Sequence, residues 1–149
     1  MSFLSSLDIA GSALTAQKKR MDVIAENISN RETTRTDNGD PYRRKLTVFR
    51  EITGRDSFAG KLKLVQNRHV SDRAGVMVSE VIEDQSDFIP VYDPNHPDAN
   101  EEGYVMMPNV DQTTEMIDAM AASRSYSANI AAFEAIKNIA GMAVRMGRN

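Results

Sequence analysis

The fold of this chain is decided by its C-terminal stretch, residues 109–147, which runs NVDQTTEMIDAMAASRSYSANIAAFEAIKNIAGMAVRMG. The stretch contains no proline, and Gly141 is its only interior glycine. Asn109 followed by Gln112 resembles a capping box, Asp111 lies where the helix dipole favours an acid, and the final glycine is a typical stop. The stretch therefore predicts one helix of roughly 55 Å at 1.5 Å per residue, too long for a compact domain of this size.

Small and apolar residues occupy two separate columns of this helix, with the heptad spacing of a coiled-coil seam. The first column comprises Ala119, Ala122, Tyr126, Asn129, Phe133, Ile136, Ala140 and Ala143. The second comprises Ala121, Ser125, Ala128, Ala132, Ala135, Ile139, Met142 and Met146. Because a helix that is apolar over most of its circumference must be surrounded, and one partner helix covers only one column, we expect the second column to meet another molecule.

The N-terminal residues 1–30 predict the only other long helix. Leu7, Leu14, Met21 and Ile28 recur every seven residues, with an intervening column that completes the spacing of a coiled-coil seam. Asn27 and the polar residues after it indicate where this helix ends. The assembly seam expected from both helices consists of Leu7, Leu14, Met21, Ile28, Tyr126, Asn129, Phe133, Ile136, Ile139, Met142 and Met146.

The middle of the chain, residues 31–108, has the pattern of a small β segment. Alternating and β-branched runs predict strands at residues 44–49, 60–65 and 75–82. Asn38-Gly39 indicates a tight turn, and the proline-rich run 93–97 indicates a rigid loop. The expected fold class is α+β: N- and C-terminal helices form a coiled-coil-like hairpin with a small, mostly β middle segment. The expected domains are a helical core of residues 1–30 and 109–149, and a β/loop segment of residues 31–108.

The composition excludes several function classes. The chain has no cysteine, which excludes disulfides, thiolate catalysis and cysteine-based zinc sites, and its net charge of −3 argues against nucleic acid. His69 and His96 are its only histidines, and the acidic loop 93–102 lacks the spacing of a calcium-binding loop. No run approaches the roughly 20 apolar residues that span a bilayer, so no direct membrane insertion is expected. We predict no enzyme, metal site or cofactor.

Charge is unevenly distributed along the middle segment. Arg43, Arg44 and Lys45 form a basic group, whereas residues 83–102 contain seven carboxylates and no Lys or Arg. One hypothesis is that the two segments meet across a subunit contact, because opposite patches set the register of an interface. The alternative is two solvated surfaces of opposite sign, and the sequence favours neither.

Several blocks resemble one protein family. Residues 13–30, ALTAQKKRMDVIAENISN, resemble the N-terminal motif shared by flagellar rod, hook and related axial proteins. Further blocks are similar to the proximal rod members of the flagellar basal-body rod protein family: 33–36 (TTRT), 39–45 (GDPYRRK), 91–100 (VYDPNHPDAN), 103–105 (GYV), 108–110 (PNV) and 122–126 (ASRSY). These blocks follow the order of the chain and include both ends.

The resemblance implies a structural subunit of the proximal rod, in a helical tube whose inner layer is built by the terminal helices of many copies. It implies that the β/loop segment lies outside, and that the rod spans the periplasm, transmits torque and lines an export channel. It also implies export by the flagellar type III system without a cleaved signal peptide. The implied partners are copies of the chain, other rod proteins, the adaptor between the rod and the MS ring, and the distal rod.

An alternative function is an accessory binding module whose helical hairpin captures a helix of another secretion or flagellar component. Such a module would be a folded hairpin when isolated and would bind at fixed stoichiometry. A rod subunit would be partly disordered at its ends when isolated and would become ordered in the polymer.

Overall fold

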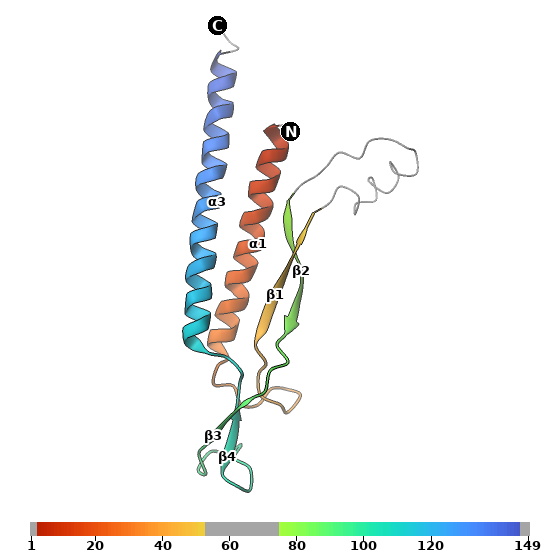
Figure 1. The fold of residues 1–149 in the computed structure, drawn as a ribbon, viewed down its shortest axis with the longest axis vertical. Helices are drawn as coiled ribbons and strands as arrows, with labels where there is room; N and C mark the ends of the chain where they lie inside the picture. Colours follow the sequence, from red (N-terminus) through yellow and green to blue (C-terminus); the bar gives the residue numbers. More distant parts are fainter. Residues whose placement is uncertain (1–2, 53–74, 147–149) are drawn as a thin grey trace, which may run out of the picture. The chain divides into compact units, whose positions relative to one another are not determined.

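The computed structural model describes residues 3–52 and 75–146, and within these ranges it contains two helices and four strands (Figure 1). The elements in chain order are α1 (Phe3–Ser29), β1 (Lys45–Glu51), β2 (Val76–Glu83), β3 (Ile89–Tyr92), β4 (Tyr104–Met107) and α3 (Gln112–Met146). Two terminal helices with a small β segment between them confirm the predicted α+β class. The predicted strand at residues 60–65 lies outside the described residues.

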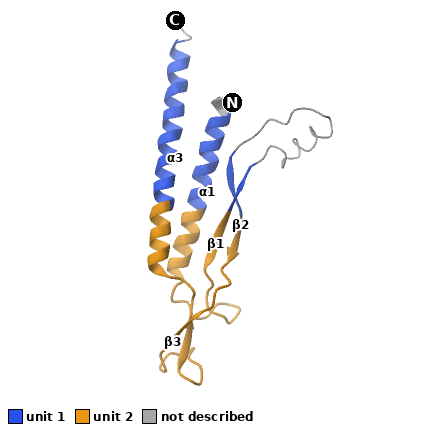
Figure 2. Ribbon diagram, viewed as in Figure 1, with its two compact units in different colours: residues 1–19, 49–79, 122–149 blue, residues 20–48, 80–121 orange. Residues whose placement is uncertain are grey.

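The chain packs into two compact units, coloured separately in Figure 2. Unit 1 comprises residues 1–19, 49–79 and 122–149, and unit 2 comprises residues 20–48 and 80–121. Each unit therefore combines a segment of both terminal helices with part of the middle of the chain. The division into a helical domain, 1–30 with 109–149, and a β/loop segment, 31–108, remains a proposal.

The buried face of α1 differs from the heptad column that the sequence pattern singled out. Its buried residues are Ala10, Ala16, Val23, Ile24 and Asn27, whereas Leu7, Leu14, Met21 and Ile28 are half-buried. The reason is that strands also contact this helix. In unit 1 the Val76 backbone N–H donates to Ser12 Oγ, 3.1 Å away. The heptad pattern predicts only the residues of α1 that pack against another helix, so it does not identify the residues that pack against the strands.

The first turn of α3 is capped by Asp111, and the predicted capping box at Asn109 is wrong. Asp111 Oδ1 accepts a hydrogen bond from the Thr113 backbone N–H at 2.8 Å, and Asp111 Oδ2 accepts one from Thr114 Oγ1 at 3.2 Å. These bonds favour the ionised carboxylate and lower the pKa of Asp111. Asn109 cannot cap the helix because its side-chain oxygen accepts a hydrogen bond from the Arg44 backbone N–H at 2.8 Å.

The first pair of strands confirms the predictions at residues 44–49 and 75–82. β1 and β2 form a two-stranded sheet. Backbone hydrogen bonds join Ile52 N to Gly75 O at 2.9 Å and Asp84 N to Arg44 O at 2.8 Å, so the strands run antiparallel. The predicted turn at Asn38-Gly39 is also confirmed, because Gly39 has a φ of +89° and its N–H bonds to the Thr36 carbonyl.

A second antiparallel hairpin, formed by β3 and β4 in unit 2, was not predicted. Its pairs run from Ile89 opposite Met107 to Tyr92 opposite Tyr104. Each strand has only four residues, and Pro90 lies inside β3. Alternation over four residues is too short to detect, and a proline ordinarily argues against a strand.

Candidate assembly site

Unit 2 contains a buried polar cluster centred on Glu115, whose exposed fraction is 1 %. Arg44 Nε donates to Glu115 Oε1 at 2.6 Å, and Asn27 Nδ2 donates to Glu115 Oε2 at 3.0 Å. Both carboxylate oxygens therefore have a donor, as a buried charge requires. Arg44 directly precedes β1, Asn27 belongs to α1 and Glu115 belongs to α3. The cluster therefore connects these three segments.

Asn27 occupies the centre of the same cluster and is also 1 % exposed. Its Nδ2 donates to the Lys45 carbonyl at 2.9 Å as well as to Glu115, and its Oδ1 accepts from the Lys45 N–H and the Tyr42 hydroxyl, each at 2.9 Å. The amide thus bonds to the start of β1 in the manner of a neighbouring strand. The polar residue that the sequence marked as a helix end is a structural anchor.

Further charges surround the buried pair. Arg44 Nη2 lies 3.4 Å from Asp118 Oδ2, and Arg20 Nη2 donates to Asp118 Oδ1 at 2.9 Å. Arg44 Nη1 lies 3.8 Å from Asp84 Oδ2. Arg44 therefore contacts three carboxylates, two on α3 and one just after β2, and it holds α3, the start of β1 and the end of β2 together.

The basic group Arg43, Arg44 and Lys45 makes its described contacts within one chain. Arg43 Nη1 donates to the carbonyls of Asp84 and Ser86, and its guanidinium carbon lies 4.3 Å from the centre of the Phe88 ring. Lys45 Nζ pairs with Glu26 at 2.6 Å and lies 5.4 Å from the centre of the Tyr42 ring. The basic and acidic segments do meet, but in these contacts they belong to the same molecule. A further contact of these residues with a neighbouring subunit remains a prediction.

The Tyr42 side chain makes the stability of the cluster depend on pH in the alkaline range. Burial, assisted by the nearby carboxylates of Glu26, Glu115 and Glu83, raises the pKa of Tyr42 from 10.0 to about 12. The raised pKa means that Tyr42 stabilises the fold fully below pH 10, and that this contribution is lost as pH rises toward 12.

We expect the Tyr42→Phe variant to be less stable than the wild type at pH 9 by about 1 kcal/mol, the net value of one hydrogen bond. The difference should shrink between pH 10 and 12. In this range the tyrosine of the unfolded wild type ionises while Tyr42 of the folded wild type stays neutral, which favours unfolding of the wild type alone. Urea unfolding at several pH values measures both. A difference that stays constant through this range would contradict the assignment.

The sequence pattern missed Glu115, Asn27 and Asp118, although one signal was present. Extending the first column of α3 toward the N-terminus by four residues from Ala119 leads to Glu115. An acid at a core position of a helix must have a buried partner. The identity of that partner, Arg44, depends on the chain path between the helices and could not be derived from spacing.

The two columns of α3 differ in exposure within unit 1. In the first column Ala122 is completely buried, and Tyr126, Asn129, Phe133 and Ile136 are half-buried. The second column is exposed: Ile139 retains 60 % of its surface, Met142 55 % and Met146 74 %. The alanines that lead up to these residues, Ala128, Ala132 and Ala135, are also exposed. Among the described residues, most of the first column is at least half-buried, although Ala143 at its end is exposed, and most of the second column is exposed, although Ser125 is half-buried.

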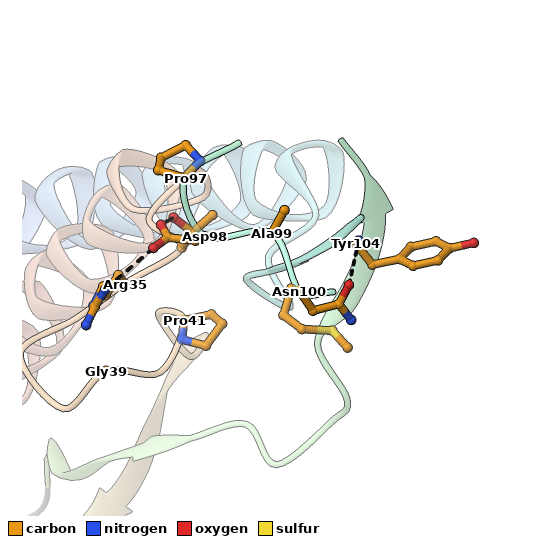
Figure 3. Close-up of a pocket in the computed structure, with 10 residues that line it drawn as sticks. Arg35, Gly39, Pro41, Pro97, Asp98, Ala99, Asn100 and Tyr104 are labelled. Carbon is orange, nitrogen blue, oxygen red and sulfur yellow. Dashed lines mark hydrogen bonds and ion pairs between the residues drawn. The ribbon is translucent and has the colours of Figure 1, made fainter. Parts of the chain in front are cut away.

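A polar hollow of about 390 Å³ lies in unit 2 between two loops. Figure 3 shows Arg35 pointing toward Asp98, with 3.8 Å between Arg35 Nη1 and Asp98 Oδ1. Asp98 also accepts a hydrogen bond from Thr34 Oγ1 at 2.8 Å, so these contacts tie the two loops together. The Tyr104 ring points away from this hollow (Figure 3).

Within residues 3–52 and 75–146 no three His, Asp or Glu side chains are grouped as metal ligands would be. His96 lies in the described part of the chain, where its Nδ1 accepts a hydrogen bond from the Asp98 backbone N–H at 3.1 Å. His69 lies outside the described residues. Neither of the two described helices has an apolar stretch long enough to cross a bilayer.

Comparison with known proteins identifies relatives along the whole chain. Residues 7–35 match the model of the flagella basal body rod protein family, and residues 101–146 match the C-terminal model of flagellar basal body rod FlgEFG proteins. The flagellar basal-body rod protein FlgC of Bacillus subtilis is 45% identical, over 99% of this chain and 100% of that protein. FlgC of Salmonella typhimurium is 39% identical, over 99% of this chain and 100% of that protein. FlgC of Borreliella burgdorferi is 36% identical, over 93% of this chain and 93% of that protein.

Proposed function

This chain belongs to the FlgC family of flagellar basal-body rod proteins, and from this premise we propose that it polymerises through the exposed column of α3. The chain is a structural subunit of the rod in the flagellar basal body, and its relatives are structural proteins. The proposal concerns how the subunit is held there.

The exposed column of α3 is the observation that carries this proposal. Ile139, Met142 and Met146 lie along one side of the helix with most of their surface uncovered. Covering each such side chain contributes about 1.5–3 kcal/mol, so a neighbouring helix over all three would contribute several kcal/mol. The exposed alanines of the same column allow the neighbour's backbone to approach closely. The half-buried residues Leu7 and Leu14, in the α1 segment of unit 1, would border the same contact, and Met21 and Ile28 would belong to the α1 part of the seam in unit 2.

The family membership supports a wider set of proposals for the assembled protein. The terminal helices, 1–30 and 109–149, would form the axial core, and the segment 31–108 would lie outside it. The polymer would transmit torque, line an export channel and span the periplasm, and the subunit would arrive through the flagellar type III system without a cleaved signal. Its neighbours would be its own copies, other rod proteins, the adaptor to the MS ring and the distal rod. No catalytic role is proposed.

A direct test replaces the chromosomal copy in the parent bacterium with an epitope-tagged chain. We expect the tagged chain in purified basal bodies and restored swimming, whereas the purified chain alone at micromolar concentration stays monomeric and incompletely helical. Normal swimming with the tagged chain recovered only outside basal bodies would contradict the proposal.

A further inference from the structure

The two units carry opposite net charge. Among the described residues, those of unit 1 include six Lys or Arg against three Asp or Glu, and those of unit 2 include six Lys or Arg against sixteen Asp or Glu. Charges segregated to this degree attract the opposite unit of a second copy and repel the same unit. The partner that fits either unit is therefore another molecule of this chain in a head-to-tail arrangement.

Unit 2 presents a preorganised apolar face on the β3–β4 hairpin. The register places Pro90 and Tyr92 of β3 on the same face as Met106 and Tyr104 of β4. All four residues are exposed, and Tyr92 retains 65 % of its surface. The two tyrosine rings meet edge to face with centroids 5.3 Å apart. Tyrosine and methionine are enriched at the centres of protein interfaces.

The Tyr92 ring lies against Gly103. Gly103 has a φ of +83°, and a Cβ at this position would lie 2.9 Å from Tyr92 Cε2. The ring therefore rests against a backbone that only glycine allows. An aromatic side chain held in place while exposed loses little conformational entropy when a partner covers it.

Acidic side chains extend from the loop that joins β3 to β4. Glu101 and Glu102 are exposed, and among the described residues neither side chain has an ion pair or hydrogen bond. Asp93, at the other end of the loop, is exposed as well. The hairpin thus combines an apolar face with an acidic tip.

Unit 1 contains a complementary groove of about 390 Å³. It is lined by Ser12, Thr15, Ala16, Lys19, Ile52, Val76, Met77 and Val78. Its walls are mainly aliphatic. Its basic rim is the exposed pair Lys18 and Lys19 of α1, of which only Lys19 is part of the groove lining. Neither lysine pairs with a carboxylate among the described residues. The groove therefore matches the hairpin in polarity and has the opposite charge at its edge.

We propose that the β3–β4 hairpin of one copy docks in the unit 1 groove of a second copy, with Glu101 and Glu102 against Lys18 and Lys19. Such a contact joins two different surfaces, so it leaves a free hairpin at one end and a free groove at the other and can be repeated indefinitely. The inference rests on the proposed function, since it supplies a second contact for the same polymer.

Charge reversal tests the pairing in the full-length chain. Lys18→Glu with Lys19→Glu reverses the rim, and Glu101→Lys with Glu102→Lys reverses the loop. At about 0.05 M salt, where charges act over more than 10 Å, each double variant should associate at least about tenfold more weakly than the wild type in sedimentation velocity. An equimolar mixture of the two should recover wild-type association, because each reversed rim then meets a reversed loop. Unchanged far-UV circular dichroism verifies that the variants fold.

The matched control is Arg124→Glu with Lys137→Glu, which changes net charge equally at exposed residues of α3 that do not line the groove. This control should associate as the wild type does. Equal weakening in the control, no recovery in the mixture, or a wild type that stays monomeric up to about 1 mM at this salt concentration would each overturn the proposal.

Because the chain has no cysteine, paired single-cysteine variants test the geometry independently. Met106→Cys on the hairpin and Met77→Cys in the groove should form a disulfide only when the two variants are mixed. Ser123→Cys, at an exposed position of α3, serves as the control partner for Met106→Cys. Mixed disulfides no more abundant than this control would overturn the docking mode. The proposed contact through the α3 column would stand in that case, because basal-body incorporation tests it separately.

Discussion

Replacing Arg44 by alanine will lower the free energy of unfolding by about 3–5 kcal/mol, because it leaves the carboxylate of Glu115 buried without its cation. Arg44 Nε lies 2.6 Å from Glu115 Oε1, and the Glu115 side chain is 1 % exposed. Asn27 supplies a remaining hydrogen bond but no positive charge. The Lys45 backbone amide, which donates to the buried Asn27 side chain, should also lose its protection from hydrogen exchange.

Urea unfolding and amide exchange measure both effects. Lys45→Ala is the matched control, because Lys45 also pairs with a glutamate at 2.6 Å but both partners are partly exposed. It should cost at most about 1 kcal/mol. Combining Arg44→Met with Glu115→Leu should recover most of the stability, since a well-packed apolar pair can replace a buried ion pair. A loss for Arg44→Ala no larger than for Lys45→Ala would show that the cluster is not a structural anchor.

The second large effect is expected from Ile139→Asp, which should abolish incorporation into basal bodies. An aspartate under a neighbouring helix is a buried, unpaired charge, and the cost of several kcal/mol exceeds what one contact supplies. Because Ile139 retains 60 % of its surface in the isolated chain, the free energy of unfolding should change by no more than about 0.5 kcal/mol. Incorporation is measured by immunoblot of purified basal bodies, and stability by urea unfolding.

Asn138→Asp provides the control for this variant, because it adds the same charge at the adjacent exposed position. We expect it to assemble normally. Phe133→Asp is a less discriminating test, since Phe133 is half-buried and its loss would also weaken the monomer. If Ile139→Asp assembled as well as Asn138→Asp does, the exposed column would have no role in the polymer.

Elements defined by long periodic patterns were predictable from the sequence. Helix α3 carries two columns of mostly small and apolar residues, and the long helix that they predicted runs unbroken from Gln112 to Met146. Phe133 of the first column is half-buried and Ile139 of the second is exposed. The strands near residues 44–49 and 75–82 were found because each alternates over six or more residues. In both cases repetition along the chain carries the signal.

Features that depend on contacts between distant segments were not predictable. Glu115 and Asn27 are 88 residues apart, and their hydrogen bond follows from the path of the chain between them. The β3–β4 hairpin has strands of four residues, held by the pairing of Tyr92 with Tyr104 and by the special backbone of Gly103. The local sequence does not indicate this hairpin, because the proline and acidic residues of the same segment are typical of a loop.

The central claim, that another subunit covers the exposed column of α3, is tested most directly by a photoreactive amino acid placed at Ile139. In assembled basal bodies it should cross-link to a second copy or to another rod protein, whereas the same group at Asn138 should give far less product. In the isolated, dilute chain neither position should cross-link to a second molecule. Equal yields at the two positions in basal bodies, or none at Ile139, would contradict the account.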